Sequence, residues 1–388
     1  MNMEETHYSD LEFLKSKDSV LYVNNIYYRD VIKDSTEAVL LMNRSRISSN
    51  CNYLKNILHK VTDNNSLICY ALKVAPSTEV LKSIKECGVG VEVYCEKELD
   101  MAIEQSIQPI VVDGMYKPKE FLFKSVENEV FLINADSIRE IYLINEIAQK
   151  LNKNQNIGIR VKYSKESKMG INIESLLKEI DSIKKLKNVN LIGVHTHPGS
   201  NVTDKNRLNA HYKKLKEAYI VLKEKGFNIK IVDFGGGLAE KIIAKDNLEE
   251  TLTNLFKMFD SDPNITFILE PGRFLVSDAG ILFAKVHDVR DSENTIILNI
   301  AVAPYFLNTY SNFIYLLPDN MEFIEKRNWK ICGIWPTDMD YIKEENLKNG
   351  LPNQIKIGDY FCFLNAGAYN IDRLGEYTLS EEIDVLYI

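Results

Sequence analysis

The segment Leu191–Ser200, LIGVHTHPGS, decides the fold, because a short apolar run passes directly into histidines, glycine and serine. Runs of this kind recur between residues 43 and 275, separated by longer amphipathic stretches such as 138–151 and 204–225. A short apolar run predicts a buried strand, and an amphipathic stretch predicts a helix. Eight such units in succession predict a parallel (β/α)8 barrel, which usually has about 250 residues. The runs are Leu67–Tyr70, Val91–Val93, Pro109–Val112, Val130–Ile133, Ile157–Val161, Leu191–Val194, Ile229–Val232 and Thr266–Leu269.

The chain after residue 276 has a different pattern. Strand-like runs dominate there, and turn signals separate them. Residues 1–42 contain strand-like runs as well, at 20–28 and 38–42, which we expect to pair with the later strands. The sequence therefore predicts an α/β protein in which residues 43–275 form the barrel. Residues 1–42 and 276–388 are predicted to form a mostly β domain that is discontinuous in sequence.

Composition excludes several classes of function. The 388 residues include 47 Lys+Arg and 55 Asp+Glu, a net charge of −8, whereas binding to nucleic acid or to an anionic membrane needs a basic surface. We find no signal peptide and no apolar run long enough to cross a membrane. The six cysteines form no Cys-x-x-Cys pair, which favours reduced thiols over a zinc or redox site. We therefore expect a cytoplasmic protein.

Polar residues follow four of the predicted barrel strands. The catalytic groups of such barrels lie at the carboxyl ends of the strands, so these residues are expected on one face. Each has an ordinary explanation when taken alone, such as a solvated lysine or a glycine-rich turn. Their occurrence together on one face is much harder to explain in that way. They are Lys73, His195 and His197, the segment Gly235–Gly237, and Glu270 with Gly272 and Arg273.

One cofactor accounts for this set of residues. A lysine amine can form a Schiff base with pyridoxal 5′-phosphate, an electron sink for carbanions. Glycine loops expose backbone N–H groups to a phosphate, and Arg273 can add charge-assisted hydrogen bonds. Glu270 can keep the pyridine nitrogen protonated, and a histidine can stack on the ring. We expect no metal, because the remaining histidines lie away from the predicted strand ends.

These motifs resemble the fold-type III pyridoxal-phosphate decarboxylases, the ornithine/diaminopimelate decarboxylase family with an alanine-racemase-like barrel. The matching segments run in order from about Thr36 to the C-terminus, and they include Tyr70–Lys73, Gly193–Ser200 and Asp233–Gly237. The resemblance implies that Lys73 binds the cofactor, that His197 stacks on its ring and that Glu270 contacts its pyridine nitrogen. It also implies cofactor-binding roles for Arg160, Ser200, Gly236, Gly237, Gly272, Arg273 and Tyr369.

The chain departs from the family pattern on the substrate side. The family's usual catalytic cysteine lies in a Gly-Pro-x-Cys-(Asp/Glu)-x-x-Asp pattern, and the corresponding stretch here is Gly333–Asp340, GIWPTDMD. Pro336 stands at the cysteine position, and a proline cannot deliver a proton. We expect Thr337, Asp338 and Asp340 to contact the substrate. The candidates for the proton donor are Lys73, which we rank first, Thr337 acting through water, and Cys332.

The resemblance therefore implies a pyridoxal-phosphate enzyme that decarboxylates an amino acid or an amino-acid-derived precursor. Substrates like diaminopimelate, ornithine or lysine, or an intermediate of siderophore or antibiotic synthesis, fit this expectation. A racemase or epimerase with the same cofactor, and a regulatory family member without decarboxylase activity, are the alternatives. A metal-dependent barrel hydrolase is a weaker one. The resemblance also implies a homodimer with shared active sites.

Overall fold

The computed structural model describes residues 11–33, 37–241, 247–259, 262–302, 315–316, 318–319, 326–342, 351–371 and 383–388. The chain divides into two compact units. The barrel unit contains residues 47–239 and 243–275. The β unit contains residues 1–46, 240–242 and 276–388.

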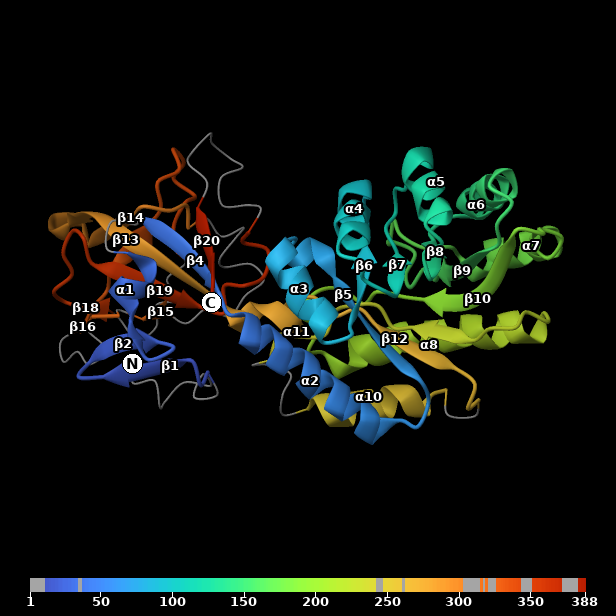
Figure 1. Ribbon diagram of the computed structural model, residues 1–388, viewed down its shortest axis with the longest axis horizontal. Coiled ribbons are helices and arrows are strands. Elements are labelled where there is room, and N and C mark those ends of the chain that lie inside the picture. Colours follow the sequence, from blue (N-terminus) through green and yellow to red (C-terminus); the bar gives the residue numbers. More distant parts are fainter. Residues whose placement is uncertain are drawn as a thin grey trace. The chain divides into compact units, whose positions relative to one another are not determined.

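The barrel unit is built on a closed parallel barrel in which eight strands follow one another in chain order (Figure 1). Each predicted run overlaps one strand, so the predicted barrel is confirmed. The ring closes where β12 pairs in parallel with β5, with Phe267 opposite Ser66. The strands are β5 (Ser66–Ala71), β6 (Gly90–Val93), β7 (Ile110–Val112), β8 (Leu132–Ala135), β9 (Gln155–Arg160), β10 (Val189–His195), β11 (Ile231–Asp233) and β12 (Thr266–Leu269).

Helices alternate with the barrel strands, and local sequence signals explain where they begin. Ser137 accepts a hydrogen bond from the Glu140 N–H at the start of α6, and Asp204 accepts from Asn206 and Arg207 at the start of α8. The buried residues of α6 include Ile141 and Ile144, one turn apart. The helices are α2 (Arg44–Val61), α3 (Thr78–Glu86), α4 (Glu96–Glu104), α5 (Lys119–Glu127), α6 (Ile138–Lys150), α7 (Ile173–Ile183), α8 (Lys205–Glu224), α10 (Leu248–Lys257) and α11 (Arg273–Val276).

The β unit is organised around β13 (Gly280–Arg290), which pairs with three other strands. It runs antiparallel to β4 (Ala38–Met42), to β14 (Thr295–Leu298) and to β19 (Tyr360–Leu364). β4 also pairs in parallel with β20 (Asp384–Tyr387) near the C-terminus. The prediction that an N-terminal strand completes the later sheet is therefore confirmed.

The first residues of the β unit form a separate small sheet of β1 (Leu14–Lys17), β2 (Val20–Val23) and β3 (Ile26–Tyr27). The predicted run at 20–28 thus pairs within this sheet, and it packs on β4, β13 and β19 through one buried apolar cluster. The remaining elements are α1 (Tyr28–Ile32), η2 (Leu72–Val74), η3 (Ser277–Ala279), η4 (Asp291–Glu293), β15 (Tyr315–Leu316), β16 (Lys326–Arg327), β17 (Lys330–Cys332) and β18 (Leu351–Pro352).

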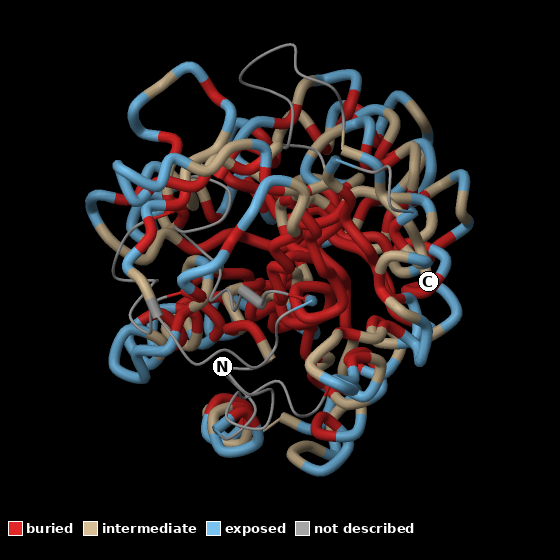
Figure 2. The backbone as a smooth tube through the Cα atoms, turned by 90° about the vertical axis from the view of Figure 1, so that its left-hand side faces the viewer, coloured by how far each residue is buried: buried red, intermediate tan, exposed pale blue. Residues whose placement is uncertain are grey.

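Burial follows the strands most closely in the barrel unit. Figure 2 shows buried segments in the interior and exposed residues on the turns and outer faces. Strands β6, β7 and β8 are buried along their whole length, which is typical of a parallel sheet covered on both faces. Among the described residues, no helix combines the length and apolar character that crossing a membrane requires.

Candidate active site

Each of the eight barrel strands places one polar residue at or near its carboxyl end. Seven of these residues are buried, and Lys73, in the turn η2 after β5, is half-buried. Buried charges are stable only when they are paired or hydrogen-bonded, so the group has to be understood as a network. Its members are Lys73, Glu92, Asp113, Asn134, Arg160, His195, Asp233 and Glu270.

Lys73 donates a hydrogen bond to Glu92 Oε2, and the two side chains form an ion pair. Glu92 lies in β6 and is opposite Ala71 of β5, two residues before Lys73. Burial lowers the pKa of Lys73, but Glu92, Glu270 and Asp113 outweigh it, and the pKa lies above its usual value. The lysine amine is therefore held at the mouth of the barrel as a charged group beside a buried carboxylate.

Arg160 ends β9 and is held by two carboxylates. Its Nη1 lies 2.9 Å from Asp113 Oδ2, and its Nε lies 3.7 Å from Asp136 Oδ1. Burial alone would raise the pKa of Asp113, but Arg160 and His195 hold it well below its usual range. The predicted cofactor residue Arg160 is thus fixed in one orientation by its acidic partners.

His195 ends β10 and lies between two acids in the barrel interior. Its Nε2 is 3.4 Å from Glu270 Oε2, and its Nδ1 is 3.8 Å from Asp113 Oδ1. Burial opposes protonation, but Asp113, Asp233 and Glu270 outweigh it and raise the pKa of His195 to about 9. At neutral pH this histidine is therefore a buried cation that balances the acids around it.

His197, in contrast to His195, is uncharged at neutral pH. Burial and the cations Lys73 and Arg160 lower the pKa of His197 to about 3, so the imidazole is neutral. Its Nδ1 accepts a hydrogen bond from the Gly236 N–H at 3.2 Å, which leaves the proton on Nε2. A neutral ring held by the glycine loop is suited to stacking on an aromatic ligand.

The predicted phosphate residues converge on the loops after β10, β11 and β12. Arg273 Nε donates to Ser200 Oγ at 3.1 Å. A Cβ added at Gly236 would lie 2.7 Å from the Glu270 carbonyl oxygen, and one at Gly237 would lie 2.5 Å from the Gly199 carbonyl oxygen. A Cβ at Gly272 would lie 2.3 Å from Val74 Cγ2. The fold therefore requires glycine at these positions.

The other predicted site residues belong to the β unit. Tyr369 has a φ of 63°, a left-handed conformation that is uncommon for an aromatic residue. Thr337 Oγ1 accepts the Met339 N–H at 3.3 Å, and Asp338 is exposed. Asp340 is buried, and its two oxygens accept the Val302 N–H at 2.6 Å and the Trp335 N–H at 2.8 Å. Its carboxylate therefore holds the turn that presents Thr337 and Asp338.

Sequence reasoning did not select Glu92, Asp113, Asn134 or Asp233 as site residues. Asn134 Nδ2 donates to Asp233 Oδ2 at 2.9 Å, and burial together with Glu270 raises the pKa of Asp233 well above its usual value. A usable signal was present in the sequence. Glu92 interrupts the apolar run Val91–Val93, and Asp113 directly follows the run Pro109–Val112. A carboxylate at such a place is expected to point into a site.

Asp113, His195 and Glu270 lie close enough together to hold a metal ion, since their ligand atoms are within 4.8 Å of one another. The surrounding charges disfavour a cation at this place. Arg160 already neutralises Asp113, and His195 carries a positive charge of its own. Together with Arg160, the three residues form a group of two acids and two cations, so the carboxylates are balanced without a metal.

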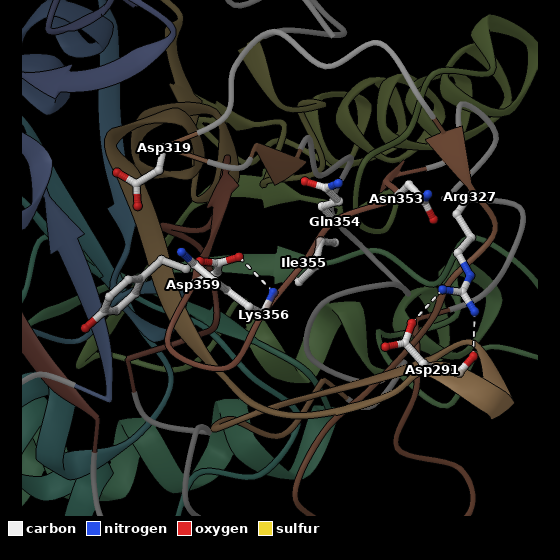
Figure 3. A pocket seen from close by; sticks show the side chains of 9 residues that line it. Asp291, Asp319, Arg327, Asn353, Gln354, Ile355, Lys356 and Asp359 are labelled. Carbon is white, nitrogen blue, oxygen red and sulfur yellow. Dashed lines mark hydrogen bonds and ion pairs between the residues drawn. The ribbon is translucent and has the colours of Figure 1, made fainter.

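A pocket of about 630 Å³ lies within the β unit, and none of the predicted site residues line it (Figure 3). Three of its charged side chains, Asp291, Arg327 and Asp319, already have partners. Arg327 Nη1 lies 2.7 Å from Asp291 Oδ1, and Arg29 Nη2 lies 2.5 Å from Asp319 Oδ2. The lining residues are Asp291, Asp319, Arg327, Asn353, Gln354, Ile355, Lys356, Asp359 and Tyr360.

The barrel residues fit pyridoxal phosphate. Glu270 Oε1 is buried and has no hydrogen-bond partner among the described residues, so it can accept from a protonated pyridine nitrogen. Ser200, Arg273 and the glycine loops supply donors for a phosphate, and His197 supplies a neutral ring. The Lys73 side chain is 33% exposed, whereas that of Glu92 is 2% exposed, so the lysine side chain is only partly covered.

Comparisons with known proteins agree with this chemistry. Residues 44–277 match the family model of the pyridoxal-dependent decarboxylases, pyridoxal binding domain. The diaminopimelate decarboxylase of Aquifex aeolicus is 30% identical to this chain over 338 residues, which cover 81% of this chain and 79% of that protein. The diaminopimelate decarboxylase of Methanocaldococcus jannaschii is 28% identical over 346 residues, covering 81% and 77%.

The fold is similar to solved structures as well. The crystal structure of a diaminopimelate decarboxylase from M. jannaschii aligns with a TM-score of 0.86 at 25% identity. The alignment covers 97% of this chain and 92% of that chain. The similarity therefore extends through the barrel unit and the β unit.

Proposed function

The chain belongs to the pyridoxal-dependent decarboxylases, and from this premise we propose that it removes the α-carboxylate of an amino acid as carbon dioxide. The observation that carries the proposal is the arrangement at the barrel mouth. A partly exposed Lys73 side chain, a neutral His197 and a buried Glu270 oxygen that has no hydrogen-bond partner among the described residues all lie in one charged network. When bound, pyridoxal phosphate supplies an electron sink for the electrons released with carbon dioxide.

The proposed roles of the barrel residues follow from their contacts. Lys73 binds the cofactor covalently, and Glu270 accepts a hydrogen bond from its ring nitrogen. His195 carries the positive charge that keeps Glu270 and Asp113 stable in the barrel interior. Arg160 also contacts the cofactor. The phosphate ligands that we propose are Ser200, Gly236, Gly237, Gly272, Arg273 and, from the β unit, Tyr369.

For the substrate we propose diaminopimelate or a related diamino acid. The relatives compared above are named diaminopimelate decarboxylases, and they cover four fifths of the chain. The turn at 333–340 presents the Asp338 carboxylate to solvent, where it can accept hydrogen bonds from a distal ammonium group. Thr337 lies beside it. We leave Asp340 out of the substrate site, because both its oxygens are bonded to backbone N–H groups.

The experiment that tests this function measures carbon dioxide and product. Purified protein is supplied with pyridoxal phosphate and incubated in turn with diaminopimelate, ornithine, lysine and arginine. We expect carbon dioxide and lysine from diaminopimelate, and Lys73→Ala serves as the matched control without activity. Carbon dioxide release from none of the four amino acids, by protein that has bound the cofactor, would contradict the proposal.

Two further measurements separate the alternatives. A racemase or epimerase would exchange the α-hydrogen for solvent deuterium without releasing carbon dioxide. A regulatory protein would keep its biological activity after Lys73→Ala. Neither alternative is favoured by a specific observation, whereas all the residues proposed to bind the cofactor are present in the chain.

We also propose the organisation in which this reaction takes place. Residues 43–275 form the cofactor-binding domain, and residues 1–42 and 276–388 form the β domain. The protein works in the cytoplasm as a homodimer with shared active sites. Light scattering on the purified full chain tests the dimer, with a molecular mass near 89 kDa expected, twice the 44.6 kDa of one chain. A monomeric mass for fully active protein would contradict it.

A further inference from the structure

The pair of Lys73 and Glu92 joins the most accessible group of the barrel network to one of its most buried groups. Glu92 Oε2 accepts a hydrogen bond from the Lys73 amine. Glu92 Oε1 is also buried, and it has no hydrogen-bond partner among the described residues. The strand pairing of β5 and β6 sets this arrangement, since Ala71 lies opposite Glu92. The carboxylate therefore has one oxygen, Oε2, bonded to the amine, and no described residue competes for its other oxygen.

The charges around Glu92 come from several barrel elements. Asp113 after β7 and Glu270 after β12 are acids, whereas Lys73 after β5 and Arg160 on β9 are cations. The thiol of Cys69 on β5 also lies within electrostatic range. Burial raises the pKa of Glu92 most strongly, Lys73 lowers it, and Glu270 and Asp113 raise it further, to about 7. Glu92 is thus already close to binding a proton while Lys73 is charged.

Loss of the positive charge on Lys73 makes protonation of Glu92 more favourable. A cation beside a carboxylate favours its ionised form, so removal of that cation favours the protonated form. When Lys73 becomes neutral, Glu92 is therefore the nearest acceptor for its proton. Because the Lys73 amine donates directly to Glu92 Oε2, this exchange needs no bridging water.

We propose that Lys73 and Glu92 share one proton, so that Glu92 is the positioning residue that switches Lys73 between a neutral amine and an ammonium group. In the forward step an N–H bond of the ammonium breaks and its electron pair stays on Nζ. A lone pair of Glu92 Oε2 forms the new O–H bond. Lys73 changes from +1 to 0 and Glu92 from −1 to 0, so the total charge is conserved. The reverse step restores the ammonium.

This inference rests on the proposed function and deepens it. A lysine reacts with a carbonyl carbon only as the neutral amine, and it can deliver a proton only as the ammonium. The family's usual cysteine donor is replaced by Pro336, which has no acidic proton. The shared proton gives the barrel unit its own donor, at an amine that lies next to the site of reaction.

Infrared spectroscopy of the full chain without added cofactor tests whether Glu92 binds a proton near neutral pH and whether the charge on Lys73 controls that binding, the two conditions that proton sharing requires. We expect a protonated-carboxyl band that titrates with a midpoint at about pH 7 and disappears in Glu92→Gln. Lys73→Met, which removes the neighbouring charge, should raise the midpoint by about 1 to 3 pH units. Glu140→Gln is the matched control, because Glu140 is another buried glutamate paired with a lysine, Lys117. It should leave the band unchanged.

The infrared measurement can refute the proposed proton sharing even if one variant fails to fold. Absence of any Glu92-dependent band across neutral pH would overturn it, and so would a band whose midpoint is the same in Lys73→Met. If Glu92→Gln does not give the circular dichroism of a folded protein, Glu92→Asp replaces it. That variant keeps a carboxyl at a different distance from the amine, and its band should titrate at a different midpoint.

Kinetics of the loaded enzyme give a second readout. At neutral pH, Glu92→Gln should lower kcat about 100-fold or more, the usual size of a lost acid–base group. Part of the loss should be recovered as the pH rises, because solvent then removes the proton from Lys73. Glu92→Asp should be intermediate. A loss of the same factor at every pH would indicate a structural role only. If wild-type protein decarboxylates no amino acid, the proposed function fails, whereas the infrared measurement still decides the shared proton.

Discussion

Replacement of His195 by glutamine probes the electrostatic balance of the barrel interior. The imidazole is fully buried between Glu270 and Asp113, and its pKa is raised from 6.5 to about 9. One pKa unit corresponds to 1.36 kcal/mol, so this difference is worth about 3 kcal/mol of folding free energy. Glutamine has a similar shape but cannot carry the charge, and the same amount should be lost.

The pH dependence of the lost unfolding free energy shows whether the loss comes from the charge on His195. A raised pKa in the folded state stabilises the protein fully below about pH 6.5 and ceases to do so as the pH rises through about 9. The difference in unfolding free energy between wild type and His195→Gln should therefore be about 3 kcal/mol near pH 6. It should shrink steadily toward pH 10.

Urea unfolding at several pH values, followed by circular dichroism, measures this difference. His211→Gln is the matched control, because His211 is also buried but its pKa is lowered, chiefly by burial. The stability that depends on neutral His211 is present above the pKa of this histidine in the unfolded chain, and it is lost only as the pH falls. The difference in unfolding free energy between wild type and His211→Gln should therefore not shrink between pH 7 and 10. A difference for His195→Gln that stays constant from pH 6 to 10 would refute the buried imidazolium.

Two further substitutions test the glycine loop and the turn of the β unit. Gly236→Ala places a Cβ 2.7 Å from the Glu270 carbonyl oxygen and 3.0 Å from His197 Cε1, so the affinity for pyridoxal phosphate should fall about tenfold or more. Fluorescence titration measures this affinity. Gly358→Ala is the control: its added Cβ meets nothing within 4 Å, its φ of +89° strains only the turn of the β unit, and the affinity should stay unchanged. Asp340→Asn should destabilise the turn by about 1–3 kcal/mol and speed hydrogen exchange at the Val302 and Trp335 amides. Exposed Asp338→Asn should not, and unchanged exchange in Asp340→Asn would contradict the turn role.

Much of the fold was predictable because a barrel repeats one local signal. Each strand of a parallel barrel is buried on both faces and reads as a short apolar run, and the eight runs fall on the eight strands. The β unit was harder, because its strands pair across large separations in the sequence. Val20–Val23 looked able to join the later sheet, but a tight turn pairs β2 with β3 instead.

Some site residues could be predicted from their position along the chain, whereas others depend on contacts between distant segments. Lys73 and Glu270 stand directly after strands, so position along the chain was enough to select them. The role of Glu92 depends on its contact with Lys73, and the register of the β5–β6 pair determines that contact. Asp340 looked like a substrate contact in sequence, whereas burial and two backbone hydrogen bonds give it a role in the turn.

The most direct test of the account is the chemical identification of the residue that binds pyridoxal phosphate. Protein loaded with the cofactor is reduced with borohydride and digested, and the modified peptide is sequenced by mass spectrometry. The account predicts one modified residue, Lys73, and no modification after Lys73→Ala. Modification at a different lysine, with Lys73 unlabelled in active protein, would contradict the central assignment.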